Sequence, residues 1–232
     1  KYLLICPYFG KLPGNFQLWL DSCAYNTKID FIVFTDDRTE FKIPQNVKII
    51  YLQFKHIQEI IRKKFSFVKN DIKPYKLCDF KPTYGYLFSN YVSGYDYWGN
   101  CDVDLIYGDL AKFLPPDPYD KISNLGHTTF YRNNELINMA FMKNNKNSLT
   151  YQEILASNAN FRLSHYDSKK DCFYEDKFDS ILSFEKGHVF TWKLSVKGVI
   201  EKKEVAYVHF QKRKMIDYRR YKKNQRFLIG AH

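Results

Sequence analysis

The chain has 232 residues, of which 45% are hydrophobic and 18% aromatic, and a formal net charge of +11. This composition is typical of one large globular domain and excludes an intrinsically disordered chain. No apolar run reaches the roughly 18 residues of a transmembrane helix. The five cysteines are scattered without a C-x-x-C pair, which argues against both a disulfide framework and a thiolate zinc site. We therefore expect a soluble protein of the reducing cytoplasm.

The first half of the chain alternates between strands and helices. Apolar runs predict buried strands at 2–9, 29–37 and 47–52, and the apolar spacing over 15–26 predicts a helix between the first two. Further helices are expected over 56–69 and over 76–92, the latter interrupted by Pro82. Another strand follows and ends at two aspartates. This order is typical of an open α/β sheet, whose ligands bind beyond the carboxyl ends of its strands.

The second half gives weaker patterns. After a proline-rich loop, 115–120, strand and helix fragments are predicted at 121–133 and 138–144, and short strands at 188–200 and 205–210. The segment HFQKRKMIDYRRYKKNQRF, residues 209–227, then carries eight Lys or Arg against one Asp. Such a charge favours an anionic partner, which could be nucleic acid, anionic lipid or a nucleotide diphosphate, although a solvated helix face is an alternative.

The pair Asp102-x-Asp104 is the sharpest chemical feature of the sequence. In an extended backbone, residues i and i+2 face the same side, so both carboxylates can reach one divalent cation or a metal-bound phosphate. The pattern alone arises often by chance. Lys76, Asp79 and Lys81 precede it at spacings that permit one charged helix face directed at the same strand end.

Four motifs occur in order, PYFG at 7–10, FTDD at 34–37, KLCDFKPTYG at 76–85 and WGNCDVD at 98–104. Together they resemble nucleotide-sugar-dependent glycosyltransferases of the GT-A fold, especially the bacterial capsule, lipopolysaccharide and O-antigen enzymes. The resemblance covers roughly the first half of the chain. It implies an α/β GT-A (Rossmann-like) mixed sheet flanked by helices, with a smaller acceptor-side region in the second half.

The resemblance also implies a donor site. Tyr8 and Phe9 would lie beside the base and Asp36 would contact the uracil or ribose, while the nucleotide and its diphosphate would be held by Lys76, Asp79 and Lys81. Asp102 would contact the ribose or the metal. The expected ligands of Mn²⁺ or Mg²⁺ are Asp102, Asp104 and His209, the last of which could instead cap a strand. Lys212 and Arg213 would neutralise the leaving diphosphate, or form a surface basic patch.

Acceptor-side residues are expected further along. Glu175 or Asp176 would deprotonate the acceptor hydroxyl in an inverting reaction, with a solvated loop as the alternative. His127 would line the acceptor or donor sugar, unless it is a core histidine. Among the many aromatic residues, only three are candidates for stacking against a sugar, namely Tyr84, Tyr86 and Trp98.

We thus expect a single domain over 1–232, with a nucleotide-sugar-binding half at 1–110, an acceptor-side half at 111–210 and a basic segment at 211–232. Its expected activity is the metal-dependent transfer of a sugar, with UDP-sugar as the preferred donor, to a glycan or lipid-linked acceptor in surface polysaccharide synthesis. The basic segment could hold the enzyme peripherally against the anionic inner leaflet. The alternative is a nucleic-acid-binding module that uses this segment, but the sequence contains no recognised nucleic-acid motif, and no such partner is expected.

Overall fold

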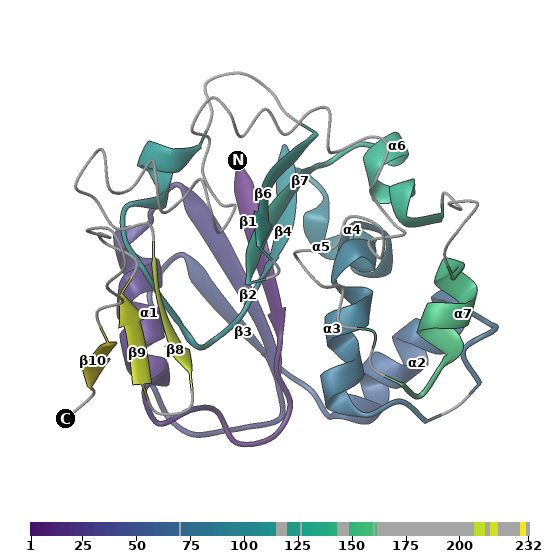
Figure 1. The fold of residues 1–232 in the computed structure, drawn as a ribbon, viewed down its shortest axis with the longest axis horizontal. Coiled ribbons are helices and arrows are strands. Elements are labelled where there is room, and N and C mark those ends of the chain that lie inside the picture. The colour runs from purple at the N-terminus through teal and green to yellow at the C-terminus, as the bar shows by residue number, and fades with distance from the viewer. Residues whose placement is uncertain are drawn as a thin grey trace.

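The centre of the molecule is a six-stranded mixed sheet, seen in a computed structural model that describes residues 1–69, 71–114, 120–125, 127–142, 149–159, 161, 207–211, 214–217 and 228–230 (Figure 1). The strand order is β3-β2-β1-β4-β7-β6. The strands are β1 (Tyr2–Pro7), β2 (Ile29–Thr35), β3 (Val47–Tyr51), β4 (Tyr97–Cys101), β6 (Lys121–Leu125) and β7 (Thr128–Arg132). The first four are parallel, and β7 and β6 add antiparallel pairs. This confirms the predicted α/β class and the mixed sheet flanked by helices.

One face of the sheet packs against α1 (Phe16–Tyr25), which connects β1 to β2. Its apolar residues recur at helical spacing, and Phe16, Trp19, Leu20 and Cys23 are buried. Trp19 stacks on Phe16 with ring centroids 5.2 Å apart. The predicted helix between the first two strands is therefore confirmed, and its buried stripe supplies the core on this side of the sheet.

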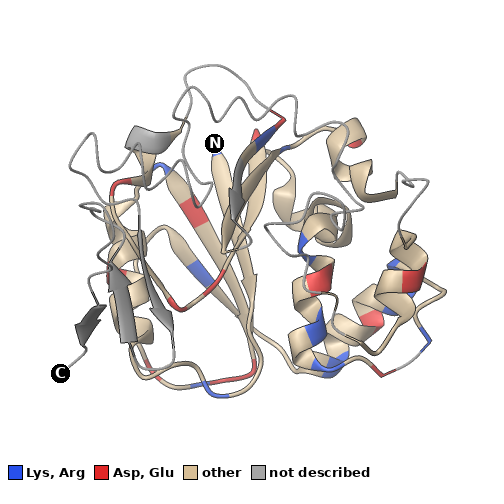
Figure 2. Cartoon of the chain, viewed as in Figure 1, with Lys and Arg blue, Asp and Glu red and all other residues tan. Residues whose placement is uncertain are grey.

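The other face is covered by short helices, gathered on the right in Figure 1. They are α2 (Phe54–Lys64), α3 (Leu77–Phe80), α4 (Tyr84–Leu87), α5 (Ser89–Val92), α6 (Glu135–Asn138) and α7 (Tyr151–Ala156). α2 is amphipathic, with Ile57 and Ile61 buried and basic residues along its outer side (Figure 2). Within the described part of the chain, none of the helices combines the length and apolar character that a membrane span requires.

The helix expected over 76–92 is a series of short turns rather than one helix. The 3₁₀ turns η1 (Pro74–Lys76) and η2 (Lys81–Thr83) alternate with α3 and α4. Pro82 lacks a backbone N–H and its ring obstructs the preceding turn, so regular α-helix cannot run through it. The consequence is that the segment does not present one continuous helix face.

A second sheet of four antiparallel strands, in the order β10-β9-β8-β5, stands beside α1. Its strands are β5 (Leu105–Tyr107), β8 (Tyr207–Gln211), β9 (Lys214–Asp217) and β10 (Leu228–Gly230). β8 corresponds to the strand predicted at 205–210, whereas the strand predicted at 188–200 lies outside the described residues. The chain passes from β4 into β5, so the segment between them joins the two sheets.

The strand order reverses between β1 and β4. From β1 the chain moves outward to β2 and β3, and then crosses back to place β4 on the opposite side of β1. In open α/β sheets, ligands bind outside the carboxyl ends of the strands at such a switch point. The segments that meet there are residues 8–15, after β1, and residues 102–104, after β4.

Candidate functional site

The two aspartates lie where β4 ends. Asp102 follows the last strand residue, Cys101, and Val103 and Asp104 form a turn that leads into β5. The spacing argument assumed an extended backbone at these residues, but the backbone forms a turn here. Val103 is buried in the core while both aspartates are half-buried. Buried Val103 anchors the turn in the core, and the two half-buried aspartates flank it at the switch point.

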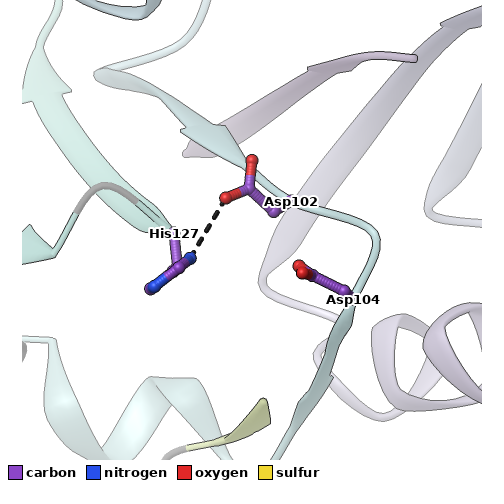
Figure 3. Close-up of side chains that lie close together, drawn as sticks. All are labelled: Asp102, Asp104 and His127. Carbon is purple, nitrogen blue, oxygen red and sulfur yellow. Dashed lines mark hydrogen bonds and ion pairs between the residues drawn. The ribbon is translucent and has the colours of Figure 1, made fainter. Parts of the chain in front are cut away.

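Asp102, Asp104 and His127 form a cluster in which one ligand atom from each residue lies within 4.8 Å of the others (Figure 3). We call these three residues the Asp-His cluster. His127 precedes β7, and its carbonyl oxygen accepts a 3.0 Å hydrogen bond from the Asp102 N–H, which continues the β4–β7 ladder. Its Nδ1 lies 3.2 Å from Oδ2 of Asp102. Backbone pairing therefore fixes the histidine beside the aspartates.

The donor set of the Asp-His cluster fits a divalent cation. Carboxylate oxygens suit Mg²⁺ and Mn²⁺, and an imidazole nitrogen favours Mn²⁺ over Mg²⁺. All three side chains are half-buried, so the cluster is partly accessible to solvent. Such an open site is suited to binding a ligand's phosphate oxygens as well as protein side chains.

Lys81 forms an ion pair with this cluster, because its Nζ lies 2.6 Å from Oδ1 of Asp102. Burial raises the pKa of Asp102, but the positive charge of Lys81 and the hydrogen bond from His127 outweigh burial and lower that pKa to about 2. For Lys81, burial lowers the pKa, but the charge of Asp102, its hydrogen bond and the nearby Cys78 and Cys6 together raise it above its ordinary value. Both groups are therefore ionised at neutral pH, and Lys81 holds Asp102 in a fixed orientation.

Lys76 and Asp79, expected beside the diphosphate, instead form a buried ion pair of 2.7 Å. The Lys76 ammonium also donates hydrogen bonds to the carbonyl oxygens of Ile154 and Ala159, at 2.8 and 2.6 Å. Asp79 accepts one from the Phe161 N–H at 3.1 Å. Lys81 lies beyond α3, in η2, and its ammonium pairs with Asp102 instead. Of the three charged residues, only Lys81 therefore contacts the Asp-His cluster.

Tyr8 and Phe9 directly follow β1 at the switch point. Burial raises the pKa of Tyr8, and the nearby Cys6, Asp104 and Asp37 raise it further. The Tyr8 hydroxyl is therefore neutral at neutral pH. The Phe9 ring packs on Phe54, at the start of α2, with centroids 5.1 Å apart.

The loop after β1 is held by the aspartates that follow β2. Asp36 Oδ1 accepts a 2.7 Å hydrogen bond from the Gly10 N–H, and Asp37 Oδ2 accepts one of 2.7 Å from the Leu12 N–H. Gly10 has a φ of +97°, a conformation that other residues rarely adopt. The exposed Asp36, expected at the base or ribose, thus fixes the loop beside the switch point.

The three aromatic candidates for sugar stacking belong to the protein interior. Tyr84 and Trp98 are fully buried, and Trp98 stacks on Tyr131 at 4.5 Å. Tyr86 is half-buried against Phe65, with Lys64 over its ring. The buried rings of Tyr84 and Trp98 have no face for a sugar and stabilise the core, and Tyr86 packs against that core.

His209 is placed by strand pairing. It lies opposite Leu105 in the antiparallel β5–β8 ladder, and Leu105 directly follows Asp104. The proposed base residues, Glu175 and Asp176, and the proposed diphosphate cations, Lys212 and Arg213, lie outside the described residues. Most of the basic segment also lies there, so its roles at a membrane or with nucleic acid stay predictions from the sequence.

Sequence reasoning missed two contacts of this site. It assigned His127 to a sugar rather than to the aspartates, and it grouped Lys81 with two residues that face elsewhere. A signal for His127 was present, because it precedes a strand, 128–132, that follows β4 closely enough in the chain to pair with it. The register that brings the two together is a property of the folded sheet.

Comparison with known proteins identifies the family. A sequence model described as a family of unknown function, DUF6625, matches residues 4–171 and 156–232. No curated protein and no solved structure matches the chain. Because the two matched ranges together span almost all of the sequence, the chain belongs to the DUF6625 family.

Proposed function

We propose that this protein is a metal-dependent glycosyltransferase of the GT-A fold, which transfers a sugar from a nucleotide diphosphate sugar to a glycan or lipid-linked acceptor in surface polysaccharide synthesis. The observation that carries the proposal is the Asp-His cluster at the switch point between β1 and β4. Two carboxylates and an imidazole there provide a cation site where open α/β sheets bind nucleotides.

The topology supports the proposal. A nucleotide-binding half built from parallel strands, here β3-β2-β1-β4, is what the motif resemblance implies, and the motifs PYFG, FTDD and WGNCDVD all lie at the carboxyl ends of these strands. The aspartate pair then leads into a second sheet through β5. The four-motif resemblance and the strand arrangement therefore agree on the position of a donor site.

Individual roles follow from the contacts. Asp102, Asp104 and His127 would hold Mn²⁺ or Mg²⁺, which when bound would neutralise charge on the leaving nucleoside diphosphate. Lys81 keeps Asp102 ionised and oriented through its 2.6 Å ion pair. Tyr8 and the loop tied by Asp36 would border the nucleoside.

Further roles are proposed from the sequence. The donor is proposed to be a UDP-sugar, as the resemblance implies. His209 would complete the metal shell, in keeping with its position opposite Leu105. Glu175 or Asp176 would act as the base of an inverting reaction, and Lys212 and Arg213 would bind the leaving diphosphate.

Isothermal titration of UDP and GDP, with and without Mn²⁺, tests the donor site. We expect one nucleotide to bind in a Mn²⁺-dependent manner, and we expect Asp104→Asn to abolish that binding because it removes one carboxylate of the cation site. Asp71→Asn, an exposed aspartate in the segment between α2 and α3, is the matched control. Absence of nucleotide binding to the folded wild-type protein, or equal binding by Asp104→Asn, would contradict the proposal.

Donor turnover gives the second test. The wild-type protein is incubated with a panel of sugar nucleotides and Mn²⁺, and the release of nucleoside diphosphate is measured. We expect one donor to be hydrolysed slowly even without an acceptor, and the release to fall to background in Asp104→Asn while Asp71→Asn stays at the wild-type rate.

A further inference from the structure

A groove of about 900 Å³ opens at the carboxyl ends of β2 and β3, beside the first turn of α2. We call it the β2–β3 groove. It is bordered by Asp36, Arg38, Tyr51, Gln53, Lys55 and His56. None of the three residues of the Asp-His cluster lines it. Its volume lies within the range of pockets that hold small organic molecules.

The charges around the β2–β3 groove favour an anion. Arg38 and Lys55 contribute two positive charges, whereas Asp36 is the one acidic side chain among the described residues that line the groove. The Oδ1 atom of Asp36 already accepts the Gly10 N–H. A ligand in the groove would therefore meet a net positive field, apart from one carboxylate that can accept a hydroxyl or N–H group.

Arg38 is preorganised for binding. Its Cζ lies 5.2 Å from the centroid of the Tyr51 ring, so the ring holds the guanidinium plane through a cation–π contact. Such stacking occupies the face of the guanidinium, whereas oxyanions bind at its edge, where the N–H donors match two oxygens of a phosphate. Arg38 can thus contact the Tyr51 ring and a phosphate at once.

The first turn of α2 adds to this field. Its N-cap residue, Gln53, makes no capping hydrogen bond with its side chain, and the first turn contains no acidic residue. The positive end of the helix dipole is therefore not neutralised by an acidic side chain of that turn. Lys55 and His56 lie in the same turn and line the groove, so side-chain charge and helix dipole act in the same direction.

We propose that the β2–β3 groove binds the phosphate group of a small phosphorylated organic molecule. Arg38 and Lys55 contact the phosphate, and the half-exposed Tyr51 and Leu52 contact the organic part. This binding goes beyond the proposed transferase activity, because it requires neither the cation nor the nucleotide. Asp36 borders the groove and also anchors the loop after β1, so the bound molecule would lie next to the proposed donor site.

The test is a titration of the whole protein with inorganic phosphate in EDTA, followed by two-dimensional NMR, with chloride at equal ionic strength as the reference. Arg38→Gln and Lys55→Gln are each expected to bind phosphate about fivefold more weakly or worse, the effect of losing one charge about 4 Å away even in water. Lys48→Gln, which removes an exposed charge of β3 outside the groove, is expected to leave the affinity unchanged.

Two results would overturn the proposal: no saturable shift that distinguishes phosphate from chloride, or the same weakening in Lys48→Gln as in Arg38→Gln. Glucose 1-phosphate is the second probe. It is expected to bind more tightly than inorganic phosphate because of Tyr51 and Leu52, and equal or weaker binding would refute their role. All titrations exclude divalent cations, so a failure of the proposed transferase activity would leave these results unchanged.

Discussion

Lys81 donates a 2.6 Å hydrogen bond to Oδ1 of Asp102 at the carboxyl end of β4. Replacing Lys81 by methionine leaves a half-buried carboxylate without its cation. We expect Lys81→Met to lower the free energy of unfolding by about 1–3 kcal/mol, the usual effect of removing one partner of a charged hydrogen bond. Urea denaturation measures this, and Lys63→Met, an exposed lysine of α2, is the control. Equal midpoints for the two variants would contradict the expectation.

The same ion pair predicts an acid dependence of stability in the metal-free protein. The pKa of Asp102 is about 2 in the folded protein against an ordinary value of 3.8. Between these pH values the unfolded chain binds more protons, so the contribution of Asp102 is fully present above about pH 4 and is lost as the pH falls through 2. It amounts to about 2 kcal/mol. Urea unfolding in EDTA from pH 6 to pH 2 should show a smaller loss in Lys81→Met than in the wild type, and parallel curves would refute this assignment.

The position of His127 predicts metal affinity. His127→Gln is expected to weaken Mn²⁺ binding by about tenfold or more, because it removes the nitrogen ligand and one partner of Asp102. His56→Gln, which changes a histidine of the β2–β3 groove, should leave Mn²⁺ affinity unchanged. Isothermal titration with MnCl₂ measures both. If the two variants bind Mn²⁺ as the wild type does, His127 is not a ligand.

The strands and the site position could be predicted from local sequence, but the partners of the site could not. Apolar runs identified β1 to β4, and the polar residues at their ends marked the edge where ligands bind. The contacts of Asp102 with Lys81 and His127 instead join residues 21 and 25 positions apart. They depend on how the short turns at 74–92 pack beside β4 and on the β4–β7 register, which no local pattern specifies.

Lys76 and Asp79 are a second case in which local sequence could not predict contacts with residues far along the chain. Their spacing suggested an exposed charged face, yet their partners, Ile154, Ala159 and Phe161, lie about 80 residues away. A charged residue is rarely buried unless it is paired and hydrogen-bonded. The sequence contains the pair, but only the docking of α7 and the residues that follow it buries the pair.

This buried pair predicts a large effect on stability. Lys76→Met leaves Asp79 buried without its cation and is expected to lower the free energy of unfolding by about 3–5 kcal/mol. The double variant Lys76→Met/Asp79→Leu should recover much of that loss, because it removes the isolated charge. Urea denaturation of both variants tests the pair. A double variant that is less stable than Lys76→Met would show that the charge is not what destabilises the single variant.

Gly99 lies in the middle of β4, where an added methyl group would collide with the carbonyl oxygen of Thr129 in β7 and lie 2.9 Å from Cδ2 of Leu4. Because the carbonyl is part of the sheet backbone, it cannot yield without separating β4 from β7. We expect Gly99→Ala to cost about 3 kcal/mol or more, the upper end for overpacking.

Separation of β4 from β7 would also carry His127 away from Asp102, since the β4–β7 ladder positions both residues. Gly99→Ala should therefore also bind Mn²⁺ more weakly under conditions where it is still folded. Gly14→Ala is the matched control, because nothing lies within 4 Å of its added methyl group, and its stability should change by less than about 1 kcal/mol. Urea denaturation and MnCl₂ titration measure the two effects. A Gly99→Ala protein as stable as Gly14→Ala, with unchanged Mn²⁺ affinity, would show that the β4–β7 pairing does not set the geometry of the Asp-His cluster.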